Sequence, residues 1–298
     1  MNATAHILDG TALAKKLKDD LKKEVARLKD VFGGLPRRQA GVPHLVNVMV
    51  GSDPGSCAYA NSQKKTAEYI GIKYELKILA GDTTQAKLIS VIKELDADSG
   101  VHGIMIHKPV PEHIDYRAVA NYVAPSKDLE GINVTNIGKM MLGQTRIIPC
   151  TPAAVMELIR STGVKLRGKE AVVVGHSEIV GKPLSLLLLA QDATVTVCHL
   201  ATSQAGRLVE HVGCADVLVV AVGKAGLIKG DWIKEGAIVI DVGINKVGSE
   251  IVGDVEFKRA SRRASFITPV PGGVGPVTVV MLMRNGIEAF KIQQEAKR

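Results

Sequence analysis

The sequence AVVVGHSEIVGKP, residues 171–183, joins an apolar strand to a glycine-containing turn and the start of a helix. The run AVVV is typical of a short buried strand, and small residues such as Gly175 and Gly181 let a pyrophosphate approach the backbone. The N-terminus of the following helix favours negative charge. Ser177 stands where the ordinary dinucleotide fingerprint has its middle glycine, so the turn alone fits a phosphate site and a structural connection equally well.

Apolar runs alternate with helical periodicity on both sides of this turn. The second half of the chain predicts helices at 153–161 and 182–190 and strands at 171–174, 194–198, 217–222 and 237–242. The first half predicts strands at 45–50, 73–79 and 101–106, with helices at 58–70 and 84–95. Because such alternation is typical of parallel sheets, we expect an α/β protein of two domains.

Two further helices are expected near the ends of the chain. Apolar residues between Leu13 and Leu28 recur at helical spacing and predict a first helix that ends before the turn around Gly33. The closing segment GPVTVVMLMRNGIEAF has Pro276 placed to open a helix and apolar residues on all its sides. We expect this last helix to be buried against the first domain.

Length and composition favour a soluble two-domain protein. The chain has 298 residues, of which 46% are apolar, enough for two modest cores. No apolar window is long enough for a membrane span, and the start MNATAHILDG lacks the pattern of a signal peptide, so we expect a cytoplasmic protein. The four cysteines are dispersed and are expected to be reduced thiols; Cys150 lacks an evident base nearby, which disfavours a nucleophile.

The net charge of +8 does not by itself indicate nucleic acid. The lysines of the first helix alternate with acidic residues, and only 3% of the residues are aromatic, which leaves little material for stacking on bases. A polyanionic small molecule such as a dinucleotide explains the positive field equally well. His102, His107 and His113 lie without acidic partners at ligand spacing, so no metal site is expected.

The most specific stretch is ITPVPGGVGPVT, residues 267–278, in which three prolines and three glycines fall close together. Such density fixes an unusual backbone path, and Gly272, Gly273 and Gly275 leave room for a ligand. Loops with costly geometry concentrate at functional sites, which favours a binding loop over a structural connector.

Several motifs in this order resemble one family nearly from end to end. They are the glycine turn above, TPVPGGVGPVT, VGSDPGSCAY (50–59), HGIMIHKPVP (102–111), KDLEGIN (127–133), PCTP (149–152) and GDWIKEGAIVIDVGIN (230–245). Together they look like the methylenetetrahydrofolate dehydrogenase/methenyltetrahydrofolate cyclohydrolase family. The resemblance implies oxidation of 5,10-methylenetetrahydrofolate to the methenyl form, then hydrolysis to 10-formyltetrahydrofolate in the same site.

The resemblance also implies a domain organisation and an assembly. Residues 1–149 with 275–298 would form a folate-binding catalytic domain closed by the C-terminal helix. Residues 150–274 would form a Rossmann-like NAD(P)-binding domain with a parallel sheet. Members of the family are typically homodimers, so a homodimer is expected here.

Carried over residue by residue, the resemblance assigns roles to three groups of residues. The catalytic group is Tyr59, Gln63, His107 and Glu130. The substrate-binding group is Ser56, Tyr59, Lys108, Glu130, Pro271, Gly272 and Gly273. The cofactor-binding group is Thr151, Gly175, His176, Ser177, Glu178, Ile179, Val180, Gly181, His199, Leu200, Ala221, Val222, Gly223, Gly243, Ile244, Gly275 and Thr278.

The sequence leaves the choice between NAD and NADP open. An acidic residue at the end of the second strand is the usual mark of NAD and a nearby arginine that of NADP, but Cys198-His199-Leu200 offers neither. Glu178 would repel a 2′-phosphate if it points toward one, which favours NAD. A Glu178 that simply faces water is the alternative.

The chain departs from the family pattern at three site positions. Gln63 replaces the lysine that assists water chemistry and cannot transfer a proton, and Lys64 lies about a quarter-turn round the helix. His107 stands at the family's strand-end glutamine, and Glu130 at an aspartate that grips the pterin.

Two explanations of these departures stay open. In one, the hydrolytic activity is lost while hydride transfer, which needs mostly positioning, survives. In the other, His107 becomes the general acid or base, although it could equally be a satisfied strand-end residue. A folate- or dinucleotide-binding paralogue without turnover, or a dehydrogenase for a different pterin, is an alternative to both.

Overall fold

The computed structural model describes residues 4–32 and 41–296, which divide into two compact units. One unit comprises Lys16–Cys150 and Val279–Arg298, and the other comprises Met1–Lys15 and Thr151–Thr278. We refer to them as the first and second unit. Each is an α/β arrangement around its own parallel sheet, as the alternating sequence pattern predicted.

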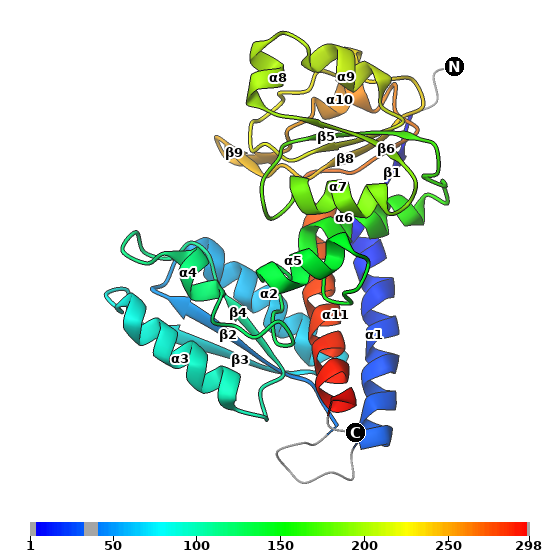
Figure 1. The fold of residues 1–298 in the computed structure, drawn as a ribbon. Helices are drawn as coiled ribbons and strands as arrows, with labels where there is room; N and C mark the ends of the chain where they lie inside the picture. The colour runs from blue at the N-terminus through cyan, green and yellow to red at the C-terminus, as the bar shows by residue number, and fades with distance from the viewer. Residues whose placement is uncertain (1–3, 33–40, 297–298) are drawn as a thin grey trace. The chain divides into compact units, whose positions relative to one another are not determined.

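The first unit is built on a three-stranded parallel sheet in the order β3-β2-β4 (Figure 1). Its strands are β2 (His44–Val50), β3 (Lys73–Leu79) and β4 (Gly103–Ile106). Its helices are α2 (Pro54–Ile70), α3 (Gln85–Ala97), α4 (Tyr116–Ala120), α5 (Val134–Met141) and most of α1 (Gly10–Phe32) and α11 (Val274–Glu295).

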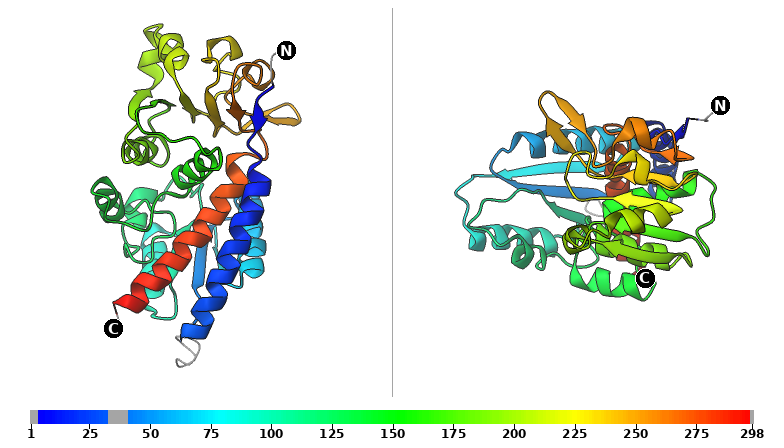
Figure 2. Two further views of the ribbon diagram at one scale, coloured as in Figure 1. Left: turned by 90° about the vertical axis from the view of Figure 1, so that its right-hand side faces the viewer. Right: turned by 90° about the horizontal axis from the view of Figure 1, so that it is seen from above.

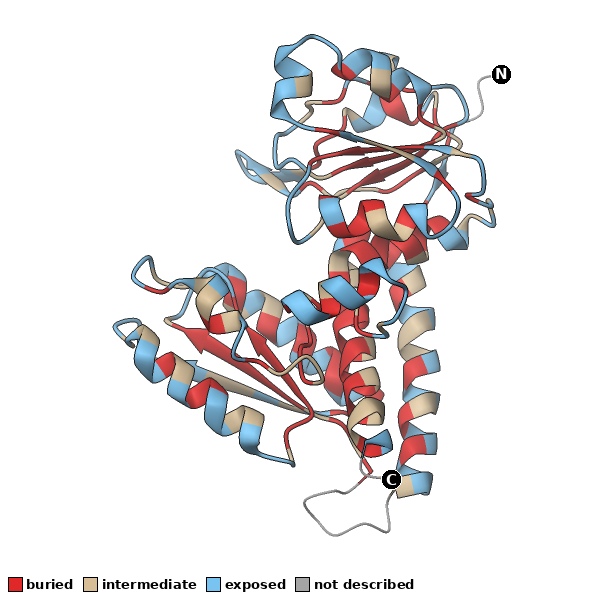
Figure 3. Cartoon of the chain, viewed as in Figure 1, coloured by how far each residue is buried: buried red, intermediate tan, exposed pale blue. Residues whose placement is uncertain are grey.

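The two faces of β2 meet different partners. Val46, Val48 and Val50 pack with residues of α3 and α4 in one buried cluster. Because side chains alternate along a strand, Asn47 lies on the opposite face, where it contacts Gln63 of α2. Figure 3 shows that the strands of this sheet are buried almost throughout, apart from the edge strand β3.

The second unit has a six-stranded parallel sheet in the order β1-β11-β8-β7-β5-β6. Its strands are β1 (His6–Ile7), β5 (Glu170–Val174), β6 (Thr194–Cys198), β7 (Val217–Val220), β8 (Ile238–Asp241) and β11 (Phe266–Ile267), and β9 (Asn245–Val247) and β10 (Glu250–Val252) form a separate antiparallel hairpin. Its helices are α6 (Cys150–Ser161), α7 (Gly181–Leu189), α8 (Leu200–Gln204), α9 (Leu208–Cys214), α10 (Phe257–Ala260) and the 3-10 turn η2 (Gly230–Trp232).

Helices cover both faces of this second sheet. Residues of α9 and α10 pack on the face formed by Val172, Val174 and Leu218, while α6 and α7 lie on the other face (Figure 1). Helices on both faces of a parallel sheet are the doubly wound arrangement, which agrees with the expected Rossmann-like domain.

The expected elements are present, with shifted boundaries. The helix expected at 58–70 begins at Pro54, because the Asp53 side chain caps it and Pro54 suits its first turn. The closing helix starts at Val274 with Pro276 in its first turn, and it groups with the first unit from Val279 onward, where the resemblance implied residue 275. The turn expected around Gly33 lies outside the described residues.

The N-terminal residues group differently from the boundary expected from the resemblance. Residues up to Lys15 belong to the second unit, because His6 and Ile7 of β1 pair with β11 at the edge of its sheet. A two-residue strand carries no periodicity, so the sequence did not indicate it. Among the described residues, no helix is both long and apolar enough to cross a membrane.

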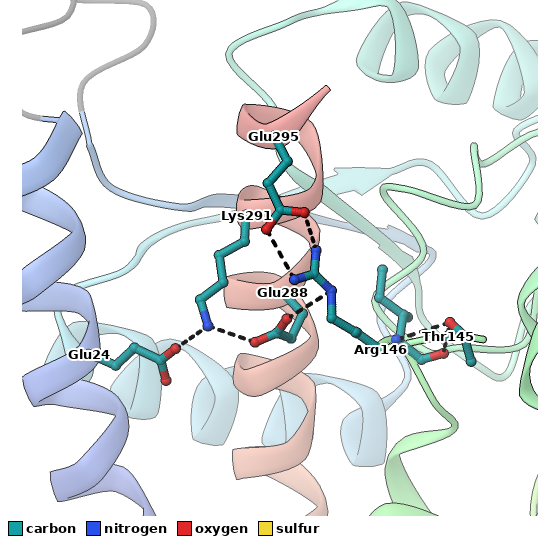
Figure 4. A network of polar contacts seen from close by, with 7 residues as sticks. Glu24, Thr145, Arg146, Glu288, Lys291 and Glu295 are labelled. Carbon is teal, nitrogen blue, oxygen red and sulfur yellow. Dashed lines mark hydrogen bonds and ion pairs between the residues drawn. The ribbon is translucent and has the colours of Figure 1, made fainter. Parts of the chain in front are cut away.

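An ion-pair network in the first unit (Figure 4) connects the loop after α5 with α1 and α11, which lie side by side in Figure 2. Arg146 binds both carboxylate oxygens of Glu295, at 3.1 and 2.8 Å, and its Nε lies 3.4 Å from Glu288. Lys291 in turn pairs with Glu288, at 2.8 Å, and with Glu24 of α1. Glu288 therefore joins the two cations, and its side chain is only 18% exposed.

Replacing Glu288 by Gln should lower the free energy of unfolding by about 1 kcal/mol, because ion pairs in a partly buried network contribute more to stability than an isolated surface pair does. The loss should shrink in 1 M salt, where the Debye length is about 3 Å. Urea unfolding at low and high salt measures both. Glu112→Gln, at an exposed position of the same unit, is the matched control, and equal unfolding free energies for the two variants would contradict the role of the network.

Candidate functional site

Three buried polar side chains and the partly buried Tyr74 meet between the central sheet and α2 of the first unit. The Nδ2 of Asn47, at the middle of β2, lies 2.5 Å from the Gln63 Oε1, 3.1 Å from the Tyr74 hydroxyl and 3.4 Å from the His107 Nε2. The Tyr74 hydroxyl also lies 3.1 Å from the Gln63 Oε1. We call Asn47, Gln63, Tyr74 and His107 the amide cluster.

Helix α2 carries Gln63 into this cluster. Its buried residues Ser56, Ala60, Gln63 and Ala67 recur at the spacing of one helical face. Gln63 is fully buried, whereas Lys64 is exposed. Lys64 is therefore no substitute for the missing lysine, as the helical geometry predicted.

His107 is a neutral imidazole at physiological pH. It follows β4 directly, is 1% exposed, and burial lowers its pKa to about 4. Its ring stands edge-on to that of Tyr59, with the centroids 6.0 Å apart. The structure thus brings together Tyr59, Gln63 and His107, three of the four residues expected to be catalytic.

The fourth of these residues, Glu130, forms a second group with Lys108 and Tyr116. Glu130 accepts a hydrogen bond of 2.7 Å from the Tyr116 hydroxyl, and the Lys108 Nζ lies 3.9 Å from the centroid of the Tyr116 ring. Burial raises the pKa of Glu130 to about 7, although Tyr116 and Lys108 oppose this rise. A carboxyl group of this kind changes charge in the physiological range.

Other side chains fix the loops that carry these groups. The buried Asp128 carboxylate accepts hydrogen bonds from the backbone of Gly131 and Asn133, which holds the KDLEGIN loop. The Ser56 hydroxyl donates to the Lys108 carbonyl oxygen at 2.7 Å and so ties the start of α2 to the loop after β4. Ser56 is 4% exposed, which makes it a structural support for the expected substrate-binding residues.

Cys150 has no features of a nucleophile. Its buried thiol donates to the Leu129 carbonyl oxygen, and burial raises its pKa well above the ordinary value. All four cysteines are free thiols, as expected.

In the second unit, the expected cofactor residues gather at one edge of the sheet. Strands β5, β6, β7 and β8 run parallel, and the expected residues Gly175–Gly181, His199 and Leu200, Ala221–Gly223, and Gly243 and Ile244 follow their carboxyl ends. Ligands of doubly wound sheets bind at this edge. Thr151 lies on α6, at the start of the longer segment of this unit, and Gly275 and Thr278 lie at the start of α11.

The glycines of the turn after β5 are required by close backbone contacts. A Cβ on Gly175 would lie 2.3 Å from the Ala221 carbonyl oxygen, and one on Gly181 would lie 2.0 Å from the Gly175 carbonyl oxygen. The Ser177 hydroxyl accepts a hydrogen bond from the Val180 backbone, at 3.1 Å, just before α7 begins. The turn therefore has no room for a side chain at Gly175 or Gly181, and the Ser177 hydroxyl lies next to the helix N-terminus.

Side chains around this turn are exposed. His176 and His199 lie with ring centroids 5.1 Å apart at the ends of β5 and β6. Glu178, Ile179 and Leu200 are exposed as well. These side chains are therefore accessible to solvent at the carboxyl edge of the sheet.

Two acidic residues that the sequence analysis did not assign support this edge. Asp254 accepts hydrogen bonds of 2.7 to 2.9 Å from the backbone of Val222, Gly223 and Lys224, and so fixes the turn after β7. Asp241 in turn accepts from the Asp254 backbone at 3.0 Å. The signal in the sequence was the IVGD segment, residues 251–254.

The proline-glycine loop before α11 belongs to the second unit. Gly272 has φ of +102°, which favours glycine, and a Cβ on Gly273 would lie 2.5 Å from the Pro269 carbonyl oxygen. Pro271, Gly272 and Gly273, expected to bind substrate, thus share a glycine-dependent backbone path. Within the described ranges, 4–32 and 41–296, no three His, Cys, Asp or Glu side chains are placed to hold a metal ion.

Two family models match the chain. The tetrahydrofolate dehydrogenase/cyclohydrolase catalytic domain matches residues 8–130, and the NAD(P)-binding domain of the same name matches residues 149–294. The bifunctional protein FolD of Bacillus pumilus is 47% identical over 290 residues, covering 97% of this chain and 98% of the relative. FolD 2 of Myxococcus xanthus is 50% identical over 287 residues, covering 96% of each.

Solved structures agree with the sequence relatives. The FolD methylenetetrahydrofolate dehydrogenase/cyclohydrolase of Campylobacter jejuni has a TM-score of 0.90 at 40% identity, covering 97% of this chain and 99% of that one. The Trypanosoma brucei FolD, described as complexed with NADP and inhibitor, has a TM-score of 0.91 at 38% identity, covering 99% and 100%.

The low pKa of His107 has a consequence for stability. Unfolded chains bind a proton at this histidine near pH 6.5, whereas the folded protein does so near pH 4. The contribution of His107 is therefore fully present above about pH 6.5 and is lost as the pH falls toward 4.

Replacing His107 by Asn should make the unfolding free energy fall less steeply between pH 6.5 and 4. Urea unfolding across this range measures the slope. Identical slopes for the unmodified chain and the variant would show that His107 is not held neutral.

Proposed function

Because the chain belongs to the tetrahydrofolate dehydrogenase/cyclohydrolase family, we propose that it oxidises 5,10-methylenetetrahydrofolate to 5,10-methenyltetrahydrofolate with NAD or NADP. The observation that carries the proposal is the match of both family domains over nearly the whole chain. The nicotinamide cofactor, when bound, supplies the hydride acceptor.

The second unit fits a dinucleotide at its strand edge. The contacts of Gly175 and Gly181 keep side chains away from the turn before α7, which leaves backbone and a helix N-terminus for a pyrophosphate. His199 and Leu200 would face the ribose, and neither is the acidic residue nor the arginine that marks a preference. The Glu178 carboxylate in the glycine turn would repel the 2′-phosphate of NADP, which favours NAD.

The first unit supplies the folate contacts. Tyr59 would pack beside the pterin, and the Glu130 carboxylate would accept its N–H groups, with Lys108 nearby. Glu130 has a longer side chain than the aspartate of the family pattern and keeps its hydrogen-bonding type, so the pterin would sit slightly displaced.

We further propose that hydrolysis of methenyltetrahydrofolate is lost or strongly weakened. Gln63 carries no titratable proton, and the buried His107 is too weak a base to replace a lysine near pH 7. These properties favour loss over the alternative in which His107 takes over proton transfer.

Purified protein given methylenetetrahydrofolate with NAD or NADP in turn should form reduced cofactor while methenyltetrahydrofolate accumulates. Absorbance at the two chromophores follows both products. Methenyltetrahydrofolate consumed faster than its uncatalysed rate would overturn the loss of hydrolysis, and His107→Asn would then test whether this histidine carries it. Cofactor affinity without hydride transfer would instead indicate a binding paralogue.

The raised pKa of Glu130 predicts pH-dependent folate binding. If the carboxylate is the binding form, the affinity for 5-formyltetrahydrofolate should rise about tenfold from pH 6 to pH 8, following ionisation near pH 7. Glu130→Gln should bind more weakly at pH 8 and lose this dependence. Isothermal calorimetry measures both, and a variant that keeps the full pH dependence would exclude Glu130 as its source.

Two broader features complete the proposal. The family resemblance favours a homodimer, which light scattering in solution tests directly. The bacterial relatives and the sequence favour a cytoplasmic location.

A further inference from the structure

The amide cluster contains two residues, Asn47 and Tyr74, to which the proposed function gives no role. Asn47 stands in the run LVNVMV at the centre of the sheet, where every neighbour on β2 is apolar. A buried amide in such a strand costs free energy unless its hydrogen bonds are made. Packing alone therefore does not explain why an asparagine stands at this position.

Asn47 and Tyr74 act on the same atom of Gln63. The Asn47 Nδ2 and the Tyr74 hydroxyl lie 2.5 and 3.1 Å from the Gln63 Oε1 and both donate to it. The Asn47 Nδ2 sets which end of the carboxamide points toward β2, because a Gln63 amide turned by 180° would place its Nε2 donor against the Asn47 donor, and the Tyr74 hydroxyl adds a second donor to the oxygen. The Gln63 Nε2 is then turned away from both donors, with the Met105 sulfur 3.5 Å away.

The oriented amide reaches Tyr59. Gln63 lies four residues after Tyr59 on α2, and hydrogen bonding from its side chain to Tyr59 partly offsets the rise in the Tyr59 pKa that burial causes. A chain of contacts thus leads from β2 and β3 through Gln63 to the tyrosine expected beside the pterin.

Asn47 is not optimised for stability. Its Oδ1 is buried without a hydrogen-bond partner in the part of the chain that the structure describes. An unsatisfied buried acceptor is destabilising, and residues that violate local packing rules in this way are found at functional sites.

We propose that Asn47 and Tyr74 are positioning residues, which set the orientation of the Gln63 carboxamide and through it the Tyr59 hydroxyl in the folate site. The inference rests on the proposed function for its substrate and goes beyond it in assigning roles to β2 and β3. Removing either donor leaves Gln63 free to rotate, and a misplaced Tyr59 lowers the rate because hydride transfer depends on position.

The test is a double-mutant cycle between Tyr74 and Gln63. Tyr74→Phe should lower kcat about fivefold and weaken 5-formyltetrahydrofolate binding, as expected for one lost neutral hydrogen bond, and leave the KM for the dinucleotide unchanged. In a Gln63→Met chain, which lacks the carboxamide, the same change should have almost no further effect. Binding of 5-formyltetrahydrofolate is measured for every variant, so the coupling between Tyr74 and Gln63 can be determined even where turnover is too slow to measure.

Two further variants separate positioning from general support of the fold. Asn47→Val should lower kcat while the thermal midpoint stays the same or rises, since it removes the unsatisfied Oδ1. Tyr69→Phe is the matched control, because the Tyr69 hydroxyl pairs with Asp19 on the surface of the same unit, away from the amide cluster.

The outcomes are distinct. Equal effects of Tyr74→Phe with and without the Gln63 carboxamide, or kcat and stability falling together in Asn47→Val, would overturn the positioning role. An unmodified chain that binds folate but transfers no hydride counts against the proposed function, whereas hydride transfer and folate binding unaffected by both substitutions count against the positioning role alone.

Discussion

Parallel pairing of neighbouring strands is the constraint on which the remaining features depend. In a parallel sheet each strand must be followed by a crossover before the next begins, so all carboxyl ends meet at one edge. In the second unit this brings the turns after β5, β6, β7 and β8 together. In the first unit it brings His107 and Lys108, directly after β4, beside the start of α2, which follows β2.

The amide cluster and the group of Glu130, Lys108 and Tyr116 differ in the charge that their side chains carry. Glu130 keeps a titratable proton near neutral pH in company with Tyr116 and Lys108. The amide cluster, in contrast, holds no ionised side chain, since His107 is neutral and Asn47, Gln63 and Tyr74 carry no charge. Chemistry that depends on orientation is compatible with both groups, and Glu130 adds a carboxyl group that gains and loses its proton near neutral pH.

The sequence predicted the long elements and the edge of the sheet, because these depend on periodicity and on glycines that the backbone requires. Strands β3 and β6 were predicted with the observed bounds, and Gly175 and Gly181 were located correctly at the turn. The partners of Gln63 were not predicted. The runs LVNVMV and KYELKIL do not indicate that the side chains of Asn47 and Tyr74 meet a residue of α2, because this contact depends on strand register and on helix packing.

Short elements escaped prediction for a related reason. Strands β1 and β11 have two residues each, and their pairing joins segments some 260 positions apart in the chain. The hydrogen bonds by which Asp254 fixes the turn after β7 were not predicted either, because their three backbone donors lie about 30 residues earlier in the chain. Contacts between distant segments leave no local pattern.

The pairing of β1 with β11 also bears on how the chain is made. The second unit needs residues from the start of the chain and from 151–278, and the first unit needs the helical segment from Val279 onward. The second unit has all its elements once Thr278 is made, whereas the first unit, begun earlier, still lacks its last helical segment, so the growing chain cannot finish the first unit before the second. Synthesis in the N-to-C direction thus leaves β1 without its neighbour until β11 is made, and leaves the sheet of the first unit without its last helix until α11 is made.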